Sequence, residues 1–301
     1  MKQLVILSGK GGTGKTSVAA ALAHLAAAEI QIVLADADVD AANLELVLKP
    51  EKLEEQVFMG GQVAIIDPER CTLCGRCYEV CRFDAVIPGD DTYRVDPLAC
   101  EGCASCVYQC PDSAIHSEEQ RAGLWFHSDT RFGPLYHAHL FAGQENSGKL
   151  VTMVKQQGRL KALDEHRQLL IVDGPPGIGC PVISAVSGAD LALIVTEPTI
   201  AGAHDLERIL GTVRHFHVPA LVCINKADLY PQGADEIEAM CTHHGIEMLG
   251  RIPFDPAVTE AMVQGEPVTL FQPEAPSSQA LAGLWEQVMA ALQEGLCPKP
   301  L

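Results

Sequence analysis

The stretch SGKGGTGKTS, residues 8–17, decides the fold of this chain. It follows an apolar, β-rich run, QLVILS at 3–8, and leads into a helical stretch, SVAAALAHLAAA at 17–28. A glycine-rich loop in this context predicts a phosphate-binding loop, or P-loop, rather than an ordinary turn. Glycines let backbone N–H groups wrap phosphates, and the helix N-terminus adds the positive end of its dipole.

In such a loop, Lys15 is expected to reach the β- and γ-phosphates of a nucleotide, and the Thr16 hydroxyl to bind Mg²⁺. The residues predicted to line the nucleotide are Gly9, Gly11, Gly12, Thr13, Gly14, Lys15, Thr16 and Ser17.

Apolar strands recur along the chain, and each ends in a polar or turn signal. They are IQIVLAD (30–36), LLIVDGPPG (169–177), DLALIVTEP (190–198), PALVCINKAD (219–228) and EMLGRIPFD (247–255). LWFHSD (124–129) also has the strand pattern, whereas 147–163 and 278–294 look helical. This alternation predicts an α/β fold with a doubly wound, mostly parallel sheet, and a site at the carboxyl ends of its strands.

The alternation of strands and helices is interrupted between residues 57 and 120. This segment contains short runs of alternating apolar and polar residues, many turn residues and clustered cysteines. We therefore predict an α/β domain in two pieces, 1–56 and 121–301, around an inserted α+β domain at 57–120. The insert contains a repeat, because CTLCGRCYEVC at 71–81 recurs 29 residues later as CEGCASCVYQC at 100–110. Both runs have the spacing C-x2-C-x2-C-x3-C.

Charge and cysteine content narrow the class of protein. A formal net charge of −18 disfavours general binding to nucleic acid or to an anionic membrane surface. No apolar run approaches the roughly 18 residues of a membrane span, so we expect a cytoplasmic protein with neither nucleic acid nor membrane as partner. Twelve cysteines in such a protein indicate metal or redox chemistry before disulfides.

The P-loop carries a second lysine, Lys10, at its start. KGGTGKT (10–16) resembles the deviant Walker A loop of the MinD/ParA superfamily of P-loop ATPases, which includes the nitrogenase iron protein and the Mrp-type cluster carriers. The resemblance implies that Lys10 crosses a dimer interface to the partner's nucleotide and acts in catalysis with Lys15. The expected assembly is a homodimer, or a heterodimer with a paralogue.

Other motifs of the superfamily follow along the chain. DADVDAANL (36–44) is similar to its switch I, in which Asp36 would support Mg²⁺ and Asp38 would position the attacking water. LLIVDGPPG is similar to its Walker B and switch II segment, which brings Asp173 toward the metal. Acidic groups around Mg²⁺ suit phosphoryl transfer, because that reaction needs positioning and charge neutralisation.

The segment INKAD (224–228) lies where the superfamily recognises the base of the nucleotide. The resemblance makes Asn225 and Lys226 candidates for base binding, with Pro253 bordering the pocket. NKxD also resembles the guanine signature of GTPases, with Asp228 as the guanine reader. The remaining motifs belong to ATPases, so ATP is preferred over GTP.

The insert resembles a bacterial-type ferredoxin with two [4Fe–4S] clusters. The resemblance implies one cluster on Cys71, Cys74, Cys77 and Cys110, and a second on Cys100, Cys103, Cys106 and Cys81. Arg82 replaces the usual proline after the first run, which alters the loop but removes no ligand. Two interleaved runs of four cysteines are not zinc-ribbon spacing, and disulfides are disfavoured in this compartment.

Four cysteines lie outside these runs. Cys180, seven residues after Asp173, is interpreted either as a transient ligand, like a cysteine at a similar offset in the nitrogenase iron protein, or preferably as a small buried thiol. Cys223 and Cys241 are predicted to lie in the core, and Cys297 in a polar tail.

Histidines recur in pairs, among them His137 and His139. We interpret them as structural or surface residues, because no acidic or cysteine cluster lies near them in the sequence.

Two functions fit these observations. The first is a Mg²⁺-dependent ATPase with two [4Fe–4S] clusters, which couples ATP binding and hydrolysis to redox chemistry or metallocluster assembly on an acceptor protein. The alternative is an ATP-gated electron donor that resembles the nitrogenase iron protein and has no role in assembly. A partitioning or positioning ATPase would need a basic or membrane-binding surface, which the charge disfavours.

Overall fold

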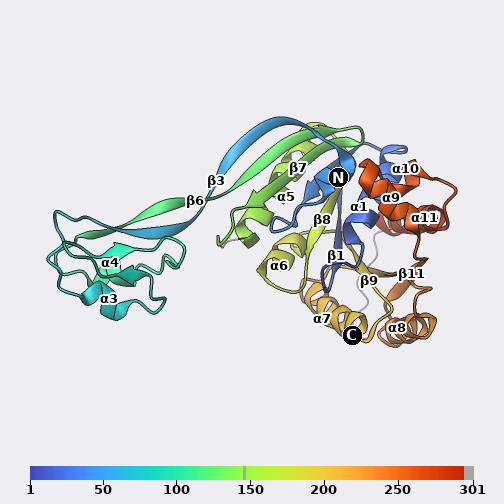
Figure 1. Ribbon diagram of the computed structural model, residues 1–301. Helices are drawn as coiled ribbons and strands as arrows, with labels where there is room; N and C mark the ends of the chain where they lie inside the picture. Colours follow the sequence, from blue (N-terminus) through green and yellow to red (C-terminus); the bar gives the residue numbers. More distant parts are fainter. Residues whose placement is uncertain (145–146, 295–301) are drawn as a thin grey trace. The chain divides into compact units, whose positions relative to one another are not determined.

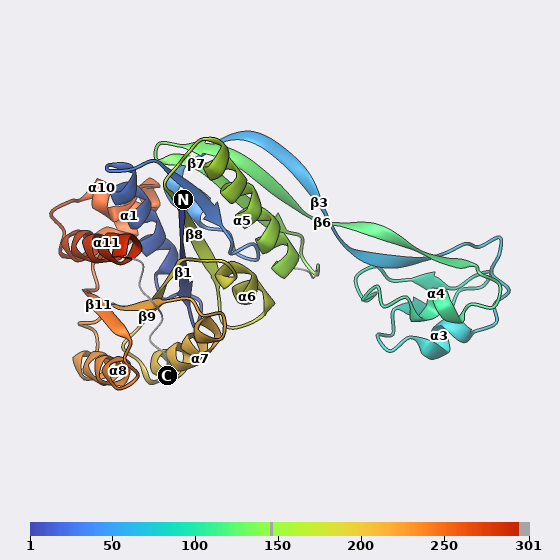
Figure 2. The same cartoon turned by 180° about the vertical axis from the view of Figure 1, so that it is seen from behind.

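Figures 1 and 2 show the computed structural model, which describes residues 1–144 and 147–294. The chain forms two compact units. The larger unit contains Met1–Glu55, Trp125–His139 and the chain from Ser147 onward. The smaller unit contains Gln56–Leu124 and a short segment that begins at Leu140. Within the described residues, no helix combines the length and the apolar character needed to cross a membrane.

The larger unit is built on the parallel strands predicted from the sequence. They are β1 (Lys2–Ser8), β2 (Ile32–Asp36), β8 (Leu169–Pro176), β9 (Leu191–Thr196), β10 (Ala220–Asn225) and β11 (Glu247–Ile252). They lie in the order β11-β10-β9-β1-β8-β2, and each neighbouring pair is parallel. β2 and β9 are buried along their whole length, as expected for strands covered by helices on both faces. The predicted α/β sheet is therefore confirmed.

Helices cover both faces of this sheet (Figures 1 and 2). Their bounds are α1 Lys15–Ala27, α2 Leu44–Leu48, α5 Ser147–Asp164, α6 Cys180–Val186, α7 Ile200–His215, α8 Pro231–His243, α9 Pro256–Gln264, α10 Val268–Phe271 and α11 Pro276–Glu294. Alternate residues of β2 show the two layers, because successive side chains of a strand point to opposite faces. Ile32 and Leu34 belong to the core formed with α1 and α11, whereas Val33 and Ala35 lie against Gly158 of α5.

Three further strands continue the sheet beyond β2 in the order β7-β6-β3. β7 (Gly133–Leu140) is parallel to β2. β6 (Ile115–Thr130) turns into β7 through only two residues, so these two strands run in opposite directions. LWFHSD is therefore the last part of β6, and not a strand of the parallel set.

β3 (Glu51–Ile66) and β6 each have 16 residues, whereas the sequence indicated only short runs in this region. The first seven residues of β3 are all exposed, so no alternation of apolar and polar residues marks them as a strand. Gly60 and Gly61 then interrupt the pattern further, since glycine is usually a turn signal.

The smaller unit repeats one backbone pattern. α3 (Arg76–Val80) and α4 (Ser105–Gln109) each begin one residue before the third cysteine of a run, and β4 (Val86–Ile87) pairs with β5 (Arg94–Val95) antiparallel. Positive φ angles recur with the 29-residue offset of the cysteines, at Leu73 and Gly102, at Gly75 and Ala104, and at Asp84 and Ser113. The sequence repeat is thus also a repeat of backbone conformation.

Gly102 provides a test of this repeat. Its φ is 61°, and an added Cβ would contact the backbone oxygen of Gln62. We expect Gly102→Ala to lower the free energy of unfolding of the smaller unit by about 2 kcal/mol or more, because it adds a clash to a left-handed conformation. Limited proteolysis with mass spectrometry of fragments from 57–124 measures the effect.

The matched control is Ala104→Gly, at a non-glycine residue with a φ of 59°. We expect this variant to resist protease at least as well as the unmodified chain, because glycine adopts positive φ without steric cost. Unchanged protease resistance of Gly102→Ala would show that the position tolerates a side chain.

Candidate nucleotide site and cysteine cavities

The P-loop joins the buried end of β1 to the start of α1. Gly12 and Gly14 have φ angles of 81° and 87°, in the left-handed region that favours glycine. Gly14 also has no room for a side chain, because an added Cβ would contact the amide nitrogen of Asn225. Thr16 and Ser17 are half-buried in the first turn of α1. The loop therefore has the glycine-dependent turn and the helix start that the sequence predicted.

Lys15 lies among three carboxylates at the carboxyl ends of β2 and β8. Its Nζ donates to Asp173 Oδ1 at 2.7 Å and lies 3.7 Å from Asp38 Oδ2. Asp36 is opposite Asp173 in the β2–β8 register. Lys15 is 6% exposed, Asp173 1%, and Asp36 is completely buried. The structure thus brings together four residues that are separated by up to 158 positions in the chain.

Burial and mutual repulsion set the protonation of these groups. Desolvation, together with the charge of Asp173, raises the pKa of Asp36 to about 8, although Lys15 and the backbone N–H groups of Asp38 and Leu44 oppose the rise. Burial likewise raises the pKa of Asp38 to about 6, against the attraction of Lys15. Burial disfavours the Lys15 cation, but the charge and hydrogen bond of Asp173 raise its pKa above the ordinary value.

The oxygen atoms of this cluster fit Mg²⁺. Among the described residues, Asp173 Oδ2 is a buried carboxylate oxygen with no hydrogen-bond partner, so its lone pairs can face a cation. Mg²⁺ prefers carboxylate and hydroxyl oxygens and keeps several waters. Asp36, Asp173 and the Thr16 hydroxyl are the groups that would hold it, and their roles as ligands stay predictions.

A glutamate that the sequence analysis did not single out, Glu197, holds two lysines beside the P-loop. Glu197 follows β9, and its Oε2 lies 3.1 Å from Lys10 Nζ. Its Oε1 accepts from Lys226 Nζ at 2.6 Å, and Lys226 Nζ also donates to Gly12 O at 3.2 Å. Burial opposes ionisation of Glu197, but the hydrogen bonds from both lysines lower its pKa below the ordinary value. The sequence feature that could have identified Glu197 is its position at the carboxyl end of a central strand.

Asn225 and Lys226 lie at the end of β10, beside the P-loop. The Asn225 amide donates through Nδ2 to Thr13 O at 2.8 Å and accepts through Oδ1 from Lys226 N at 3.0 Å. This amide therefore braces the P-loop, and its contact with a base stays a prediction. Asp228 Oδ1 accepts a hydrogen bond from the backbone N–H of Phe254 at 2.5 Å. This bond connects the loops that follow β10 and β11.

The eight clustered cysteines lie around two small cavities of the smaller unit. One cavity is lined by Cys71, Cys74, Cys77 and Cys110, and the other by Cys81, Cys100, Cys103 and Cys106. Each cavity thus receives three cysteines from one run and the fourth from the other run. These groups coincide with the two ligand sets that the ferredoxin resemblance implied.

The two cavities have similar surroundings. Apolar side chains contribute to both walls, including Ile115 in the first and Val86 in the second. Burial raises the pKa of Cys77 and of Cys106, the third cysteine in each run. The backbone N–H of Ala114 donates a hydrogen bond to Cys110 Sγ at 3.3 Å. Hydrogen bonds to sulfur and limited exposure are the features by which proteins tune the potential of iron–sulfur clusters.

The remaining cysteines differ in exposure. Cys223 and Cys241 are completely buried, which confirms the prediction for both. Cys180 is exposed at the first residue of α6, so the preferred interpretation as a buried thiol is wrong. Cys180 opens α6 directly after the loop that follows β8, and its Cβ and backbone lie beside Gly148 of α5. Cys297 lies outside the described residues.

Comparison with known proteins gives relatives along most of the chain. Residues 4–268 match the family of CobQ/CobB/MinD/ParA nucleotide-binding domains. An uncharacterized protein of Methanocaldococcus jannaschii is 34% identical over 255 residues, which are 84% of each chain. An iron–sulfur cluster carrier protein of Pyrococcus horikoshii is 25% identical over 312 residues, covering 97% of this chain and 87% of its own.

Among solved structures, the septum site-determining protein MinD complexed with Mg-ADP from Pyrococcus horikoshii has a TM-score of 0.59. It covers 95% of both chains at 20% identity, and this likeness concerns the fold alone.

Asp36 makes the stability of the protein depend on pH. Its pKa rises from 3.8 to about 8 on folding, so the folded state holds the extra proton and stability falls as the pH increases through that window. Asp36→Asn removes the charge. In EDTA, we expect this variant to unfold at a clearly higher temperature than the unmodified chain at about pH 8.5, and at nearly the same temperature at about pH 3.5, below the start of the window. Thermal unfolding by circular dichroism measures both.

Asp164→Asn, which removes an exposed carboxylate at the end of α5, is the control and should change little at either pH. A stabilisation by Asp36→Asn of equal size at both pH values would contradict the charge-based explanation.

Proposed function

Because this chain belongs to the family of CobQ/CobB/MinD/ParA nucleotide-binding domains, we propose that it is a Mg²⁺-dependent ATPase with two [4Fe–4S] clusters. It couples ATP binding and hydrolysis to redox chemistry or to metallocluster assembly on a partner protein. One observation carries the proposal. The chain that holds the P-loop and its carboxylates also gathers two groups of four cysteines, each completed by a cysteine from the opposite run, as in two-cluster ferredoxins.

In this proposal, the larger unit acts on the nucleotide by positioning and charge. Lys15 would exchange its hydrogen bond to Asp173 for one to a phosphate. Asp36 and Asp173 would hold Mg²⁺, which when bound neutralises phosphate charge. Asp38, with a pKa of about 6, is mostly ionised at neutral pH and can accept a hydrogen bond from the attacking water.

ATP is the proposed nucleotide rather than GTP. Asp228, which would read guanine in a GTPase, already accepts a backbone N–H through one carboxylate oxygen. A comparison of ATP and GTP hydrolysis by the purified protein separates the two nucleotides.

The proposed active form is a dimer, either of two copies or with a paralogue. Lys10 is 35% exposed and paired with Glu197 of its own chain. On dimer formation, the Lys10 ammonium would leave Glu197 for the phosphates of the partner's nucleotide, while Lys226 would continue to neutralise Glu197.

The completeness of the cysteine groups supports the second function, ATP-gated electron transfer without an assembly role. All eight inserted cysteines line the two cavities, so each cluster would have four thiolate ligands from the chain itself. A cluster that is handed to another protein would be held more loosely. The relative named as an iron–sulfur cluster carrier supports the assembly role instead.

The pairing of the runs predicts a pattern of iron loss. Anaerobically purified protein should hold about eight iron and eight sulfide ions, and the double variants Cys71→Ser/Cys74→Ser and Cys100→Ser/Cys103→Ser about four of each. Adding Cys110→Ser to the Cys71→Ser/Cys74→Ser variant should cause no further loss of iron. Adding it to the Cys100→Ser/Cys103→Ser variant should remove nearly all of the remaining iron. Iron and sulfide analysis measures these contents, with Cys180→Ser as the exposed-cysteine control that keeps all eight. Zinc in place of iron, or the opposite dependence on Cys110, would overturn the proposed ligand sets.

The coupling of nucleotide to clusters predicts a shift in redox potential. In an EPR-monitored redox titration, MgATP should lower the midpoint potential by about 30 mV, which is ~0.7 kcal/mol for a one-electron couple. Lys10→Ala should still bind MgATP but show no shift, because it lacks the proposed contact across the dimer. The same potential with and without MgATP in the unmodified chain would leave the clusters as independent carriers and reject ATP gating.

A further inference from the structure

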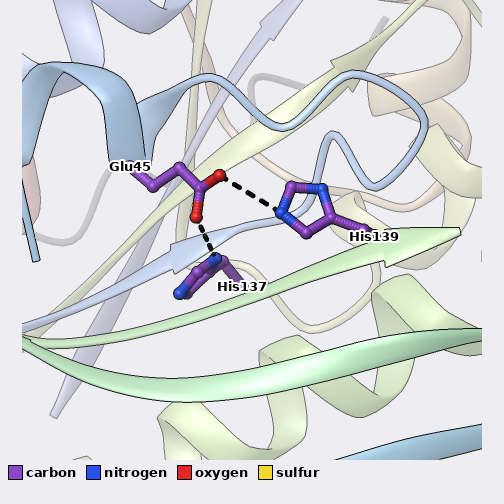
Figure 3. Close-up of side chains that lie close together, drawn as sticks. All are labelled: Glu45, His137 and His139. Carbon is purple, nitrogen blue, oxygen red and sulfur yellow. Dashed lines mark ion pairs between the residues drawn. The ribbon is translucent and has the colours of Figure 1, made fainter. Parts of the chain in front are cut away.

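A second group of metal-ligating side chains lies in the larger unit, apart from the P-loop carboxylates and the cysteines. It consists of Glu45 from α2 and of His137 and His139 from β7 (Figure 3). The two histidines are two residues apart on a strand, so their side chains leave the same face. One ligand atom from each residue lies within 4.8 Å of the others. From the sequence, these histidines were interpreted as structural or surface residues because no acidic or cysteine cluster lies near them. In the folded chain, α2 brings Glu45 to them, although this glutamate precedes His137 by 92 residues.

The contacts within the group converge on its centre. Glu45 Oε2 lies 3.0 Å from His137 Nδ1, and Glu45 Oε1 lies 3.2 Å from His139 Nε2. Figure 3 shows both rings directed at the carboxylate. Each residue thus presents a lone-pair atom to the same small volume.

His137 shows that the group is more than an ion pair. Its side chain is 1% exposed, and its Nδ1 is a buried nitrogen without a hydrogen bond among the described residues. An ion pair with Glu45 would require a protonated, charged imidazole in this buried position, which is costly. A neutral imidazole could donate Nδ1–H to the carboxylate, but this nitrogen makes no such hydrogen bond, although Glu45 Oε2 is only 3.0 Å away. A neutral imidazole can instead offer the Nδ1 lone pair to a metal ion without taking up a proton.

The surroundings of His137 resemble those of metal-bound histidines. Its Nε2 lies 2.9 Å from the Oγ of Ser128, which is completely buried. When Nε2 carries the proton and donates it to this hydroxyl, Nδ1 is left as the ligand, and such second hydrogen bonds orient histidines around metals. The Phe126 ring stacks on His137 at 4.9 Å between centroids and meets the edge of His139 at 5.5 Å. Both imidazoles are therefore held in place before any metal binds.

The donor set indicates the kind of metal. Two imidazole nitrogens and one carboxylate oxygen suit Zn²⁺ and neighbouring transition metals, whereas Mg²⁺ and Ca²⁺ prefer sites of oxygen alone. Ligands at 2.0–2.2 Å from a tetrahedral Zn²⁺ lie roughly 3.3–3.5 Å apart. The two observed nitrogen-to-oxygen separations, 3.0 and 3.2 Å, are close to this value, and all three ligand atoms lie within 4.8 Å of one another. Three protein ligands leave a fourth position for water or for a partner's side chain.

We propose that Glu45, His137 and His139 bind one divalent transition-metal ion of the Zn²⁺ class, which fastens α2 to β7. The site borders switch I directly. The N–H of Leu44, the residue before Glu45, donates to Asp36 Oδ2 at 3.0 Å. The metal thus fixes the helix that begins on a carboxylate of the nucleotide site.

The test measures Zn²⁺ itself rather than ATPase activity. Full-length protein, purified anaerobically with its iron, is equilibrated with ZnCl₂, desalted and analysed for zinc by mass spectrometry. We expect one zinc ion per chain in the unmodified protein, and at least about 100-fold weaker binding in His139→Gln and Glu45→Gln. Both substitutions are at partly exposed side chains, so circular dichroism should show unchanged folding. His116→Gln is the matched control, because it removes an exposed histidine paired with Glu118 at 2.9 Å in a group of only two.

X-ray absorption at the zinc edge separates this site from adventitious binding to cysteine. We expect nitrogen and oxygen neighbours at about 2.0–2.1 Å and no sulfur shell at about 2.3 Å. A sulfur shell, or equal zinc retention by the unmodified chain and by His139→Gln and Glu45→Gln, would overturn the proposal. Zn²⁺ should also raise the unfolding temperature of the unmodified chain and of His116→Gln, but not of the two ligand variants.

Discussion

The buried ion pair between Lys15 and Asp173 is the interaction on which the nucleotide end of the sheet depends. The register of β2 and β8 places Asp36 and Asp173 opposite each other with almost no access to water. Lys15 compensates the charge of Asp173, and Asp36, with its raised pKa, keeps its proton near neutral pH. Truncating one member of such a buried group leaves an uncompensated charge, which is strongly destabilising. A phosphate that takes the Lys15 hydrogen bond would likewise leave the Asp173 carboxylate in need of a cation. Nucleotide and Mg²⁺ binding should therefore favour each other.

Patterns local in the sequence predicted much of this arrangement. Continuous apolar strands and the glycine loop sufficed for the parallel sheet and for Lys15 at the start of α1, whereas Asp173 was singled out by the family resemblance. Glu197 was marked only by its position at the end of a strand, and Glu45 had no local signal at all. The partners of both glutamates come from other elements, and only the folded chain brings them together. The length of β3 was hidden by its exposed residues. Cys180 was misjudged because its exposure depends on how the loop after β8 leaves the sheet.

The segment predicted to be switch I, residues 36–44, and the Glu45–His137–His139 group share one short connection. Asp36 accepts the N–H of Leu44 at the start of α2, and Glu45 is the next residue. α2 has only five residues, so a change in Asp36 on nucleotide binding cannot be absorbed within a long helix. Nucleotide binding should therefore alter the geometry of the histidine group, and with it the affinity of that group for a ligand. By thermodynamic linkage, a ligand bound to the histidine group should change the nucleotide affinity by the same factor.

The chain enters the cysteine-bearing unit along β3 and leaves it along β6, and these two strands are neighbours in the sheet. The ends of the cysteine-bearing segment, Gln56–Leu124, are therefore about one strand spacing apart, ~4.8 Å. A plain hairpin could close the same gap without disturbing any pair of the parallel core. Over evolutionary time, a single recombination event at this edge could add or remove the whole cysteine-bearing segment. The ATPase and the cysteine-bearing segment can thus be inherited as separable modules and refined under different selection.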